Sequence, residues 1–287
     1  MSERSPQNKH LTPFIHWVGG KGQSIKEIVP YFQSYNERYW EPMIGGGSLF
    51  LWTKPHNAAI SDINPELVNL WRVVKDYPAE LIKELERHKR NHCEEYYYKV
   101  REILNQIKLT GDTKYHSKEL NNPPNIKNAG MFLYLNKAGF NGLYRENGKG
   151  LINVPYGHKE KIALFTKQNI HAIGEYLRDN NIKIICQDYG EIKPKEGDFV
   201  YLDPPYDGTY NDYTARQFSQ LRLKEFCDQL DEMGIKWLQT NNNTDTIRRL
   251  YDNYHLKVIT VNAVINSNGE DRKDCRQDLI ITNYEKY

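Results

Sequence analysis

Apolar and polar positions along the chain follow two different periods. Short apolar runs typical of buried strands alternate with stretches that have the spacing of amphipathic helices. The expected strands are residues 39–44, 58–62, 182–186, 198–202, 235–239, 257–259 and 279–282. Helical spacing covers residues 24–33 and resumes after Asn64-Pro65, where proline stands at an early helical position. Strands that alternate with helices predict an α/β domain with a mostly parallel sheet.

The alternation is interrupted in the middle of the chain. A charged helical pattern comes first, then a polar segment at residues 111–128, then Asn147-Gly148 and Gly150 with the chemistry of a hairpin turn. The chain therefore divides into an α/β domain and an insertion. The expected bounds are residues 1–70 and 161–287 for the domain and 71–160 for the insertion.

Composition narrows the class of protein. The 287 residues are 39% hydrophobic and 26% charged, as in a globular protein with a sizeable core. No apolar run of about eighteen residues occurs and the N-terminus lacks an apolar segment, so neither a membrane span nor a secretory signal is expected. The cysteines lack C-x-x-C spacing, which argues against a zinc site or a disulfide framework and fits a reducing cytosol; they are Cys93, Cys186, Cys227 and Cys275.

Charge is distributed unevenly along the chain. The net charge is only +2, but residues 71–160 hold 16 Lys/Arg against 11 Asp/Glu. A basic insertion within an acidic remainder favours a polyanionic partner, although such an excess also occurs on solvated helices.

The four residues Asp203-Pro204-Pro205-Tyr206 follow the apolar run of residues 198–202. The carboxyl end of a buried strand is where open α/β sheets place their ligands. Two prolines stiffen the backbone and remove two N–H donors, so carbonyls, a carboxylate and an aromatic ring remain. Such a site can accept hydrogen bonds from an exocyclic amine and stack on a planar base. A proline-stiffened turn without a ligand is the alternative interpretation.

A glycine turn, Gly45-Gly46-Gly47-Ser48, connects an expected strand to an apolar helix. Glycines let a ligand approach the backbone at a helix N-terminus, and Asp62, at the end of the next strand, can accept the hydroxyls of a ribose. Phe50 replaces the third glycine of G-x-G-x-x-G, and residues 17–21 do not match a P-loop. These features favour a nucleoside cofactor without phosphates, such as S-adenosylmethionine. A turn that serves packing alone is the alternative.

Six blocks, in this order, resemble the Dam-type DNA adenine-N6 methyltransferases. They are Trp17 to Lys21, Glu41 to Ser48, Ser61 to Asn64, Phe140 to Arg145, Asn153 to Gly157 and Asp203 to Tyr206. The resemblance spans about residues 13–287. It implies a Rossmann-like methyltransferase domain, with a mixed sheet and helices on both faces, and a helical and β-hairpin insertion for target recognition. It also implies an S-adenosylmethionine-dependent enzyme that flips an adenine out of a short GATC-related duplex site.

The resemblance assigns roles to individual positions. Residues of the catalytic motif are Asp203, Pro204, Pro205 and Tyr206. The cofactor positions are Trp17, Lys21, Glu41, Pro42, Met43, Gly45, Gly47, Ser48, Asp62, Asp188, Tyr189 and Asp203. The positions that meet DNA are His16, Phe140, Asn141, Leu143, Arg145 and Pro155. No metal is implied.

The insertion would read DNA through its hairpin, because a two-stranded ribbon fits the major groove. Arg145 can donate two hydrogen bonds to a guanine edge, and Leu143 and Pro155 can contact a thymine methyl. Phe140 can wedge into the base stack as the target leaves it. The alternatives are a surface ion pair of Arg145 with Glu146 or Glu160 and a core contact for Phe140.

The chain departs from the family pattern at three places. His16 stands where the family usually carries a lysine that reads an outer guanine, and a neutral imidazole has one donor and a shorter reach. The polar segment 111–128 is longer than usual. The loop between Tyr206 and Leu221 is short, at 14 residues, and is expected to help hold the extruded base with Tyr210, Tyr213 and Phe218. These departures leave the recognition sequence open.

Three other functions stay open. Cytosine-N4 methylation differs only in the base that offers the amine, and a catalytically silent DNA-binding protein would keep the fold without the chemistry. A nicotinamide-dependent oxidoreductase would need the glycine that is absent. The expected partner is double-stranded DNA, with no membrane and no obligate protein partner. The expected location is the cytoplasm, on nucleoid or viral DNA, in a restriction-modification, phage, viral or housekeeping role.

Overall fold

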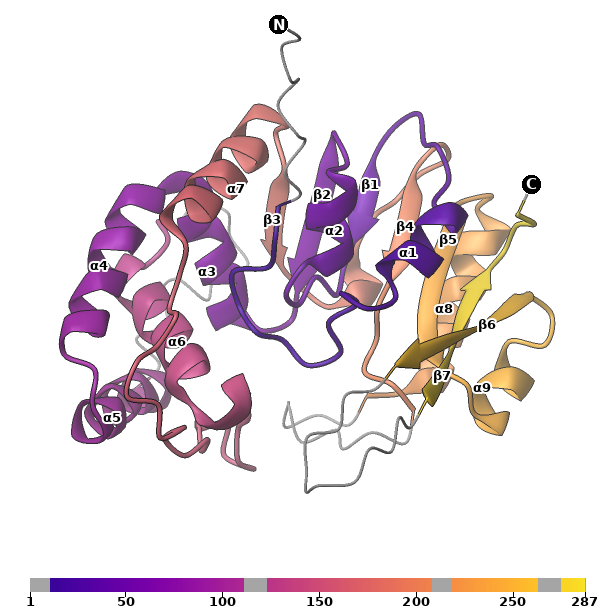
Figure 1. Cartoon of the computed structure of the whole chain (residues 1–287). Helices are drawn as coiled ribbons and strands as arrows, with labels where there is room; N and C mark the ends of the chain where they lie inside the picture. Colours follow the sequence, from indigo (N-terminus) through magenta and orange to yellow (C-terminus); the bar gives the residue numbers. More distant parts are fainter. Residues whose placement is uncertain (1–10, 111–122, 208–217, 263–274, 287) are drawn as a thin grey trace, which may run out of the picture.

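The computed structural model describes residues 11–110, 123–207, 218–262 and 275–286 (Figure 1). Its strands are β1 Tyr39–Glu41, β2 Ala58–Asp62, β3 Lys183–Cys186, β4 Phe199–Leu202, β5 Lys236–Asn242, β6 His255–Asn262 and β7 Cys275–Thr282. They form one sheet in the order β3-β2-β1-β4-β5-β7-β6. Strands β1 to β5 are parallel, and β7 runs antiparallel to both β5 and β6. The predicted mixed sheet, with its seven expected strands, is confirmed.

Helices lie on both faces of the sheet. The α-helices are α1 Ile25–Ile28, α2 Ser48–Thr53, α3 Pro65–Asp76, α4 Pro78–Arg90, α5 Glu94–Thr110, α6 Ile126–Ala138, α7 Lys167–Asp179, α8 Gln220–Glu232 and α9 Asp245–Leu250. The short 3-10 helices are η1 Val29–Tyr31, η3 Phe140–Gly142 and η4 Tyr189–Glu191. The helix expected over residues 24–33 is shorter than predicted, because Pro30 has no N–H to continue the α-helical ladder.

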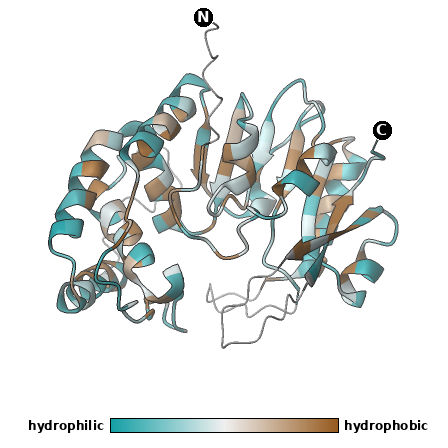
Figure 2. Ribbon diagram, viewed as in Figure 1, coloured by the Kyte–Doolittle hydropathy of each residue, from teal (hydrophilic) through white to brown (hydrophobic). Residues whose placement is uncertain are grey.

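Helices can pack on both faces of the sheet because side chains alternate between the two faces along each strand. On β4, Phe199 and Tyr201 join one core with α2, α3 and α7, whereas Val200 and Leu202 join a second core with α8 and α9. Buried strands with apolar side chains on both faces are typical of sheets covered on both sides. Hydrophobic residues accordingly concentrate on the strands and on the helix faces turned toward them (Figure 2).

The predicted insertion contributes α4, α5 and α6. Helix α6 packs against α4, α5 and α3, and α4 packs against α3 and α7. The insertion's apolar side chains belong to the same core as those of the sheet face that α2, α3 and α7 cover. Helix α3 continues to Asp76, beyond the expected boundary after residue 70. Glu146 and Ile152 pair around the turn at residues 147–150, where the Asn147 N–H donates to the Leu151 carbonyl at 2.9 Å. The domain bounds themselves stay a prediction.

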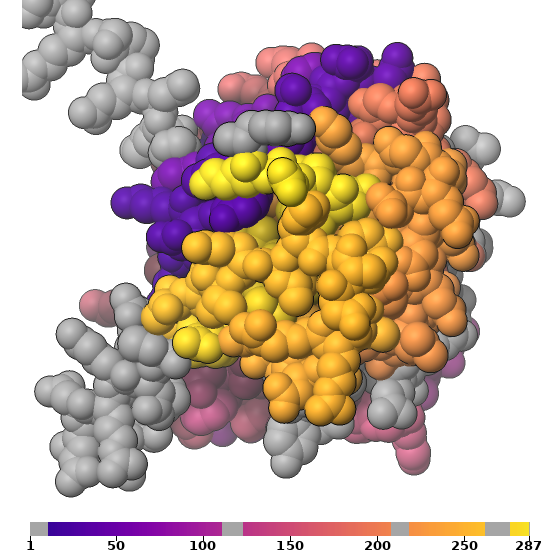
Figure 3. All heavy atoms as spheres, turned by 90° about the vertical axis from the view of Figure 1, so that its right-hand side faces the viewer, coloured from indigo at the N-terminus to yellow at the C-terminus, as the bar shows by residue number. Residues whose placement is uncertain are grey.

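The last described residues lie against the segment around Tyr31. From the side of α8, α9, β6 and β7, the yellow C-terminal residues cover part of the indigo N-terminal segment (Figure 3). The Tyr284 hydroxyl donates to the Tyr31 carbonyl at 2.6 Å. Within the described ranges, no helix combines the length and the apolar character needed to cross a membrane.

Candidate active site

The candidate site lies where neighbouring parallel strands end. Because β2, β1, β4 and β5 are adjacent and parallel, their carboxyl ends meet at one edge of the sheet. Glu41 ends β1, Asp62 ends β2, Asp203 follows β4, and Thr240 lies near the end of β5. The fold therefore gathers at one edge side chains that are up to about two hundred residues apart in the sequence.

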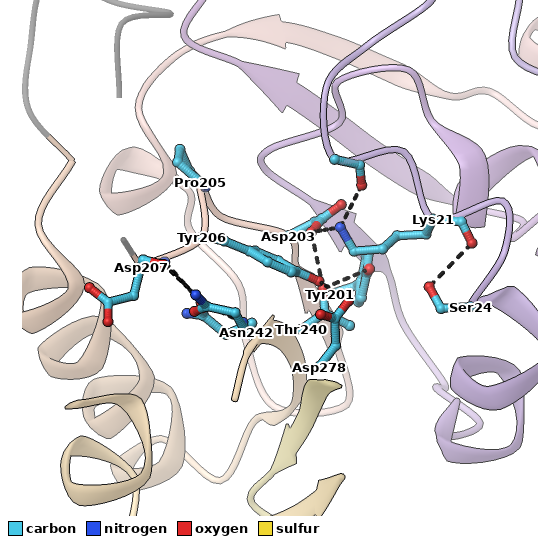
Figure 4. Close-up of polar contacts among 12 residues, drawn as sticks. Lys21, Ser24, Tyr201, Asp203, Pro205, Tyr206, Asp207, Thr240, Asn242 and Asp278 are labelled. Carbon is cyan, nitrogen blue, oxygen red and sulfur yellow. Dashed lines mark hydrogen bonds and ion pairs between the residues drawn. The ribbon is translucent and has the colours of Figure 1, made fainter. Parts of the chain in front are cut away.

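Asp203 is held by two side chains that approach the same oxygen (Figure 4). The Lys21 ammonium forms an ion pair with Oδ1, and the Thr240 hydroxyl donates to Oδ1 at 3.0 Å. Burial raises the pKa of Asp203, while Lys21 and Thr240 lower it. Since both neighbours use Oδ1, the second carboxylate oxygen is left to accept from a ligand. Lys21 is 4% exposed and also donates to the Gly19 carbonyl at 2.6 Å.

The Tyr206 ring is buried beside this carboxylate. Its hydroxyl donates to Asp278 Oδ2 on β7 at 3.3 Å. The Lys21 ammonium lies 4.6 Å from the ring centroid, and the Arg276 guanidinium carbon lies 5.4 Å from it. The predicted stacking residue is thus fixed at its hydroxyl and lies close to two cations.

Polar side chains near the start of α8 and the end of β5 hold the rest of the motif. Gln220 donates to the Pro205 carbonyl at 2.8 Å, and Thr244 donates to the Asp207 carboxylate at 2.9 Å. Asn242 donates to the Asp207 carbonyl. Sequence reasoning missed Thr240 and these residues. For Thr240, Asn242 and Thr244, the available signal was the polar run Gln239 to Thr244 at the end of the strand expected at residues 235–239.

The glycine turn is packed against two tryptophans. Gly45 and Gly47 have φ of +48° and +67°, and a Cβ atom there would lie 2.6 Å from Trp17 and 2.7 Å from Trp71, respectively. The Trp71 indole N–H donates to the Gly45 carbonyl at 3.0 Å. Both backbone conformation and packing therefore require glycine at these two positions.

The Asp62 carboxylate is oriented by backbone donors. Gly45 N–H donates to Oδ2 at 3.1 Å, and Asn64 N–H donates to Oδ1 at 2.9 Å. Burial raises the pKa of Asp62 to about 6, although these two hydrogen bonds lower it. Each oxygen keeps a lone pair, so the carboxylate can still accept a hydroxyl pair such as that of a ribose.

Glu41 differs from the other carboxylates of the site. It is 2% exposed and accepts a hydrogen bond from the Tyr39 hydroxyl at 2.5 Å. Burial raises the pKa of Glu41 to about 8. The side chain therefore carries a proton at neutral pH, and it can donate as well as accept.

Asp188 and Tyr189 lie together after β3, as the resemblance implies, but Arg222 of α8 lies on them. Its guanidinium pairs with Asp188 at 2.5 Å, and its central carbon lies 4.8 Å from the Tyr189 ring centroid. The Tyr189 ring also packs against Phe226 at 5.5 Å. Arg222 thus covers the two groups that are predicted to meet the cofactor adenine.

The remaining predicted cofactor residues surround this edge. Pro42 and Met43 lie on the turn that joins β1 to α2, and Ser48 begins α2. Trp17 stacks on Tyr144 of the insertion, with ring centroids 5.5 Å apart and planes at 18°. The indole therefore contacts both the glycine turn and the insertion.

The predicted DNA-contacting residues come together from separate segments. Asn136 of α6 accepts from the His16 N–H at 3.0 Å and donates to the His16 and Gly142 carbonyls at 2.8 and 3.0 Å. This contact joins the N-terminal segment to the 3-10 turn η3. Phe140 N–H donates to the Pro155 carbonyl at 2.9 Å, which brings the other end of the hairpin alongside.

The alternatives for two of these residues do not match the geometry. Phe140 is 50% exposed and is therefore not a core residue. Arg145 donates to the Asn153 side chain at 2.9 Å, while Glu146 pairs with Lys108 at 2.6 Å. The exposed residues of this face are His16, Phe140, Asn141, Arg145 and Pro155, with Leu143 partly buried among them.

Two of the aromatic residues predicted to hold the extruded base, Tyr210 and Tyr213, lie outside the described residues. The third, Phe218, packs on Tyr189 with ring centroids 5.8 Å apart. Of the polar segment at 111–128, residues 111–122 also lie outside the described part.

The sheet order, the carboxylates at the strand ends and the acceptor motif after β4 define a Rossmann-like methyltransferase. The chain belongs to the D12 class N6 adenine-specific DNA methyltransferases, whose family model matches residues 17–265. This confirms the family, the fold class and the enzyme class predicted from the sequence. It also decides for adenine-N6 over cytosine-N4 methylation and against an oxidoreductase.

Individual relatives are similar over most of their length. The chain is 33% identical to Type II methyltransferase M1.LlaDCHI of Lactococcus lactis subsp. cremoris, over 96% of each chain. It is 34% identical to Type II methyltransferase M.MjaIII of Methanocaldococcus jannaschii, over 96% of this chain and 99% of the relative. It is 32% identical to the DNA adenine methylase of Escherichia coli K12, over 91% of each chain.

Proposed function

We propose that this methyltransferase moves a methyl group from S-adenosylmethionine to N6 of an adenine extruded from a short GATC-related duplex site. One observation carries the proposal: Asp203 is held through Oδ1 by Lys21 and Thr240, beside the buried Tyr206 ring. This arrangement offers a second carboxylate oxygen and a stacking face to a planar base with an exocyclic amine.

The donor and acceptor groups of the site fit S-adenosylmethionine. Asp62 would accept the ribose hydroxyls, and the turn from Glu41 to Ser48 would line the cofactor with Trp17. Asp188 and Tyr189 would meet the cofactor adenine once Arg222 moves, and Arg222 has room to move because its side chain is 54% exposed. When bound, the cofactor supplies an electrophilic methyl group on a sulfonium.

The residues of the chain activate the adenine amine. Its lone pair is delocalised into the ring, which makes N6 a poor nucleophile. Asp203 and the Pro204 carbonyl would accept its two N–H bonds, so that the nitrogen pyramidalises and recovers lone-pair density. Tyr206 would stack on the base and aim the amine, so that catalysis rests mainly on positioning. As N6 gains the methyl group it would lose one proton, to Asp203 or to water.

The recognition face supports a duplex substrate. Arg145 would donate to a guanine edge, Leu143 and Pro155 would contact a thymine methyl, and Phe140 with Asn141 would fill the space left in the stack. His16 replaces the usual lysine. Partial burial, Lys137 and Lys159 lower the pKa of His16, so a neutral imidazole faces the outer base pair and a relaxed preference there is expected.

The proposal is tested with Asp203→Ala. We expect this variant to lose methyl transfer to duplex DNA while binding S-adenosylmethionine within about tenfold of the wild type, because the carboxylate acts on the amine. Asp252→Ala, which removes an exposed carboxylate after α9, is the control. Normal turnover by Asp203→Ala would overturn the assignment. Modified-base sequencing of DNA from cells that express the protein would report the methylated base and its sequence context.

We further propose that the enzyme acts on double-stranded DNA without an obligate protein partner, in the cytoplasm. Methyl transfer by the purified chain alone would test the first part. A requirement for a second protein would contradict it.

A further inference from the structure

Strand β7 carries a buried carboxylate that neither the motif nor the resemblance assigns. Asp278 is 1% exposed, and its strand lies between β5 and β6, where it pairs with Asn242 and Ile259. Its carboxylate accepts from the Tyr206 hydroxyl at 3.3 Å. Asp278 therefore fixes the orientation of the proposed stacking ring from the side of the C-terminal strand.

The same carboxylate holds Arg276. The guanidinium donates from Nε to Oδ1 at 2.8 Å and from a terminal nitrogen to Oδ2 at 2.9 Å, which is a two-point contact that defines its plane. The Arg276 side chain is nevertheless 50% exposed, and its central carbon lies 5.4 Å from the Tyr206 ring centroid. A guanidinium has five N–H donors, and the contact with Asp278 uses two of them.

We propose that Arg276 binds a DNA backbone phosphate next to the extruded adenine, and that Asp278 is the positioning residue that aligns Arg276 with Tyr206. The inference rests on the proposed function, in which Tyr206 stacks on that adenine. An extruded nucleotide takes its flanking phosphates toward the mouth of the site. A half-exposed, preoriented guanidinium beside the stacking ring matches the planar, two-point geometry in which arginine binds phosphate.

The simpler interpretation is that Arg276 only neutralises Asp278. A buried carboxylate needs a charge partner, and an exposed arginine can provide one without meeting DNA. The two interpretations predict different effects of an Arg276 variant on binding to DNA in which one phosphate has been made neutral. Only a phosphate contact makes the effect of an Arg276 variant depend on the charge of one particular phosphate.

The test combines a protein change with a DNA change. Binding of wild type and Arg276→Gln is measured, at several salt concentrations, on a short duplex with one methylatable adenine. The same duplexes are made with a methylphosphonate at the phosphate on either side of that adenine. We expect Arg276→Gln to weaken binding about tenfold and to lower the salt slope by about one. On one of the two duplexes with a methylphosphonate, Arg276→Gln should bind with the same affinity as the wild type.

Two further variants test the geometry. Arg276→Lys keeps the charge without the two-point contact, and we expect it to restore the salt slope but only part of the affinity. Asp278→Asn keeps an acceptor for Tyr206 but loses the ion pair, and it should weaken DNA binding while S-adenosylmethionine binding stays unchanged. Lys236→Gln is the matched charge control, because Lys236 is exposed at the amino end of β5, away from the site.

The role of Arg276 would be overturned if the affinity losses from Arg276→Gln and from the methylphosphonate were additive on both modified duplexes. A fall in kcat with unchanged DNA affinity and salt slope would also overturn it. A wild-type protein that methylates no adenine would instead overturn the proposed function. The two failures are therefore distinguishable.

Discussion

At the scale of single residues, Thr240 controls the hydrogen bonding of the proposed catalytic carboxylate. It is 1% exposed and donates to Asp203 Oδ1, and its hydroxyl lies 3.2 Å from that of Tyr201. A hydroxyl that occupies one oxygen of a carboxylate leaves the other in a defined direction. The orientation of Asp203 is thus set from the neighbouring strand as well as by its own turn.

Replacing Thr240 by valine should lower kcat about tenfold, because a hydrogen bond to a charged group is lost at nearly constant shape. Single-turnover methyl transfer would measure the change, and S-adenosylmethionine affinity should stay near that of the wild type. Thr240→Ser keeps the hydroxyl and should retain most of the activity. If the valine variant turned over normally, Asp203 would not need this contact.

Glu41 makes stability depend on pH. Burial raises its pKa from 4.5 to about 8 in the folded chain. The unfolded chain loses this proton near pH 4.5, whereas the folded chain keeps it until about pH 8. The stabilisation from the protonated group is therefore fully present below pH 4.5 and is lost as the pH rises through 8.

We therefore expect Glu41→Gln to gain stability relative to the wild type as the pH rises from about 5 to 8, by roughly 5 kcal/mol at most. Urea unfolding at several pH values would measure the difference. Glu232→Gln, which changes an exposed glutamate of α8, should show no such trend. A constant difference between Glu41→Gln and the wild type would contradict the protonated state.

At the scale of elements, helix α6 positions the recognition face. Asn136 is 2% exposed and hydrogen-bonds to both His16 and Gly142, so one side chain aligns an N-terminal segment with a turn of the insertion. Gly142 has φ +65°, and a Cβ atom there would clash with the His16 ring. This close packing restricts movement of the His16 segment relative to the turn at Gly142.

Asn136→Ala should raise KM for DNA about tenfold and reduce discrimination at the outer base pair, because the two hydrogen bonds to His16 and the one to Gly142 are lost. Steady-state kinetics on duplexes that differ only at that pair would show the effect. Asn128→Ala changes another buried asparagine, in the first turn of α6 and far along the helix from Asn136, and serves as the control. Unchanged discrimination in Asn136→Ala would show that the contact is structural only.

At the scale of the whole molecule, a charged cluster joins the predicted insertion to α3. Lys108 of α5 pairs with Glu66 of α3 at 3.0 Å and with Glu146 of the hairpin at 2.6 Å. Burial lowers the pKa of Lys108, but the two carboxylates raise it by more, and the net pKa lies above the ordinary value. One ammonium therefore links three parts of the fold.

Removing this ammonium should be costly, because two partly desolvated carboxylates would remain side by side. We expect Lys108→Met to lower the free energy of unfolding by about 3 to 5 kcal/mol at neutral pH. Lys99→Met, on an exposed position of the same helix, should change stability little. Equal stability of the two variants would show that the cluster does not stabilise the fold.

The sequence by itself determined the strands, the glycine turn, the hairpin turn and the position of Asp203 to Tyr206. These features depend on neighbours in the chain: alternation or helical spacing of apolar residues, positive φ at glycine, and the rigidity of proline. The family blocks depend on the same local order. The order of the residues along the chain is therefore sufficient to predict them.

Only the tertiary structure decided how the site is held. Thr240 lies 37 residues from Asp203, Asp278 lies 72 residues from Tyr206, and Asn136 lies 120 residues from His16. No local pattern links such pairs, because they meet only after strands have found their order in the sheet and helices have packed on it. The same reason explains Arg222 of α8, which pairs with Asp188, 34 residues earlier in the chain. The sequence is thus sufficient to predict the chemistry of this enzyme, whereas tertiary packing sets the geometry of its active site.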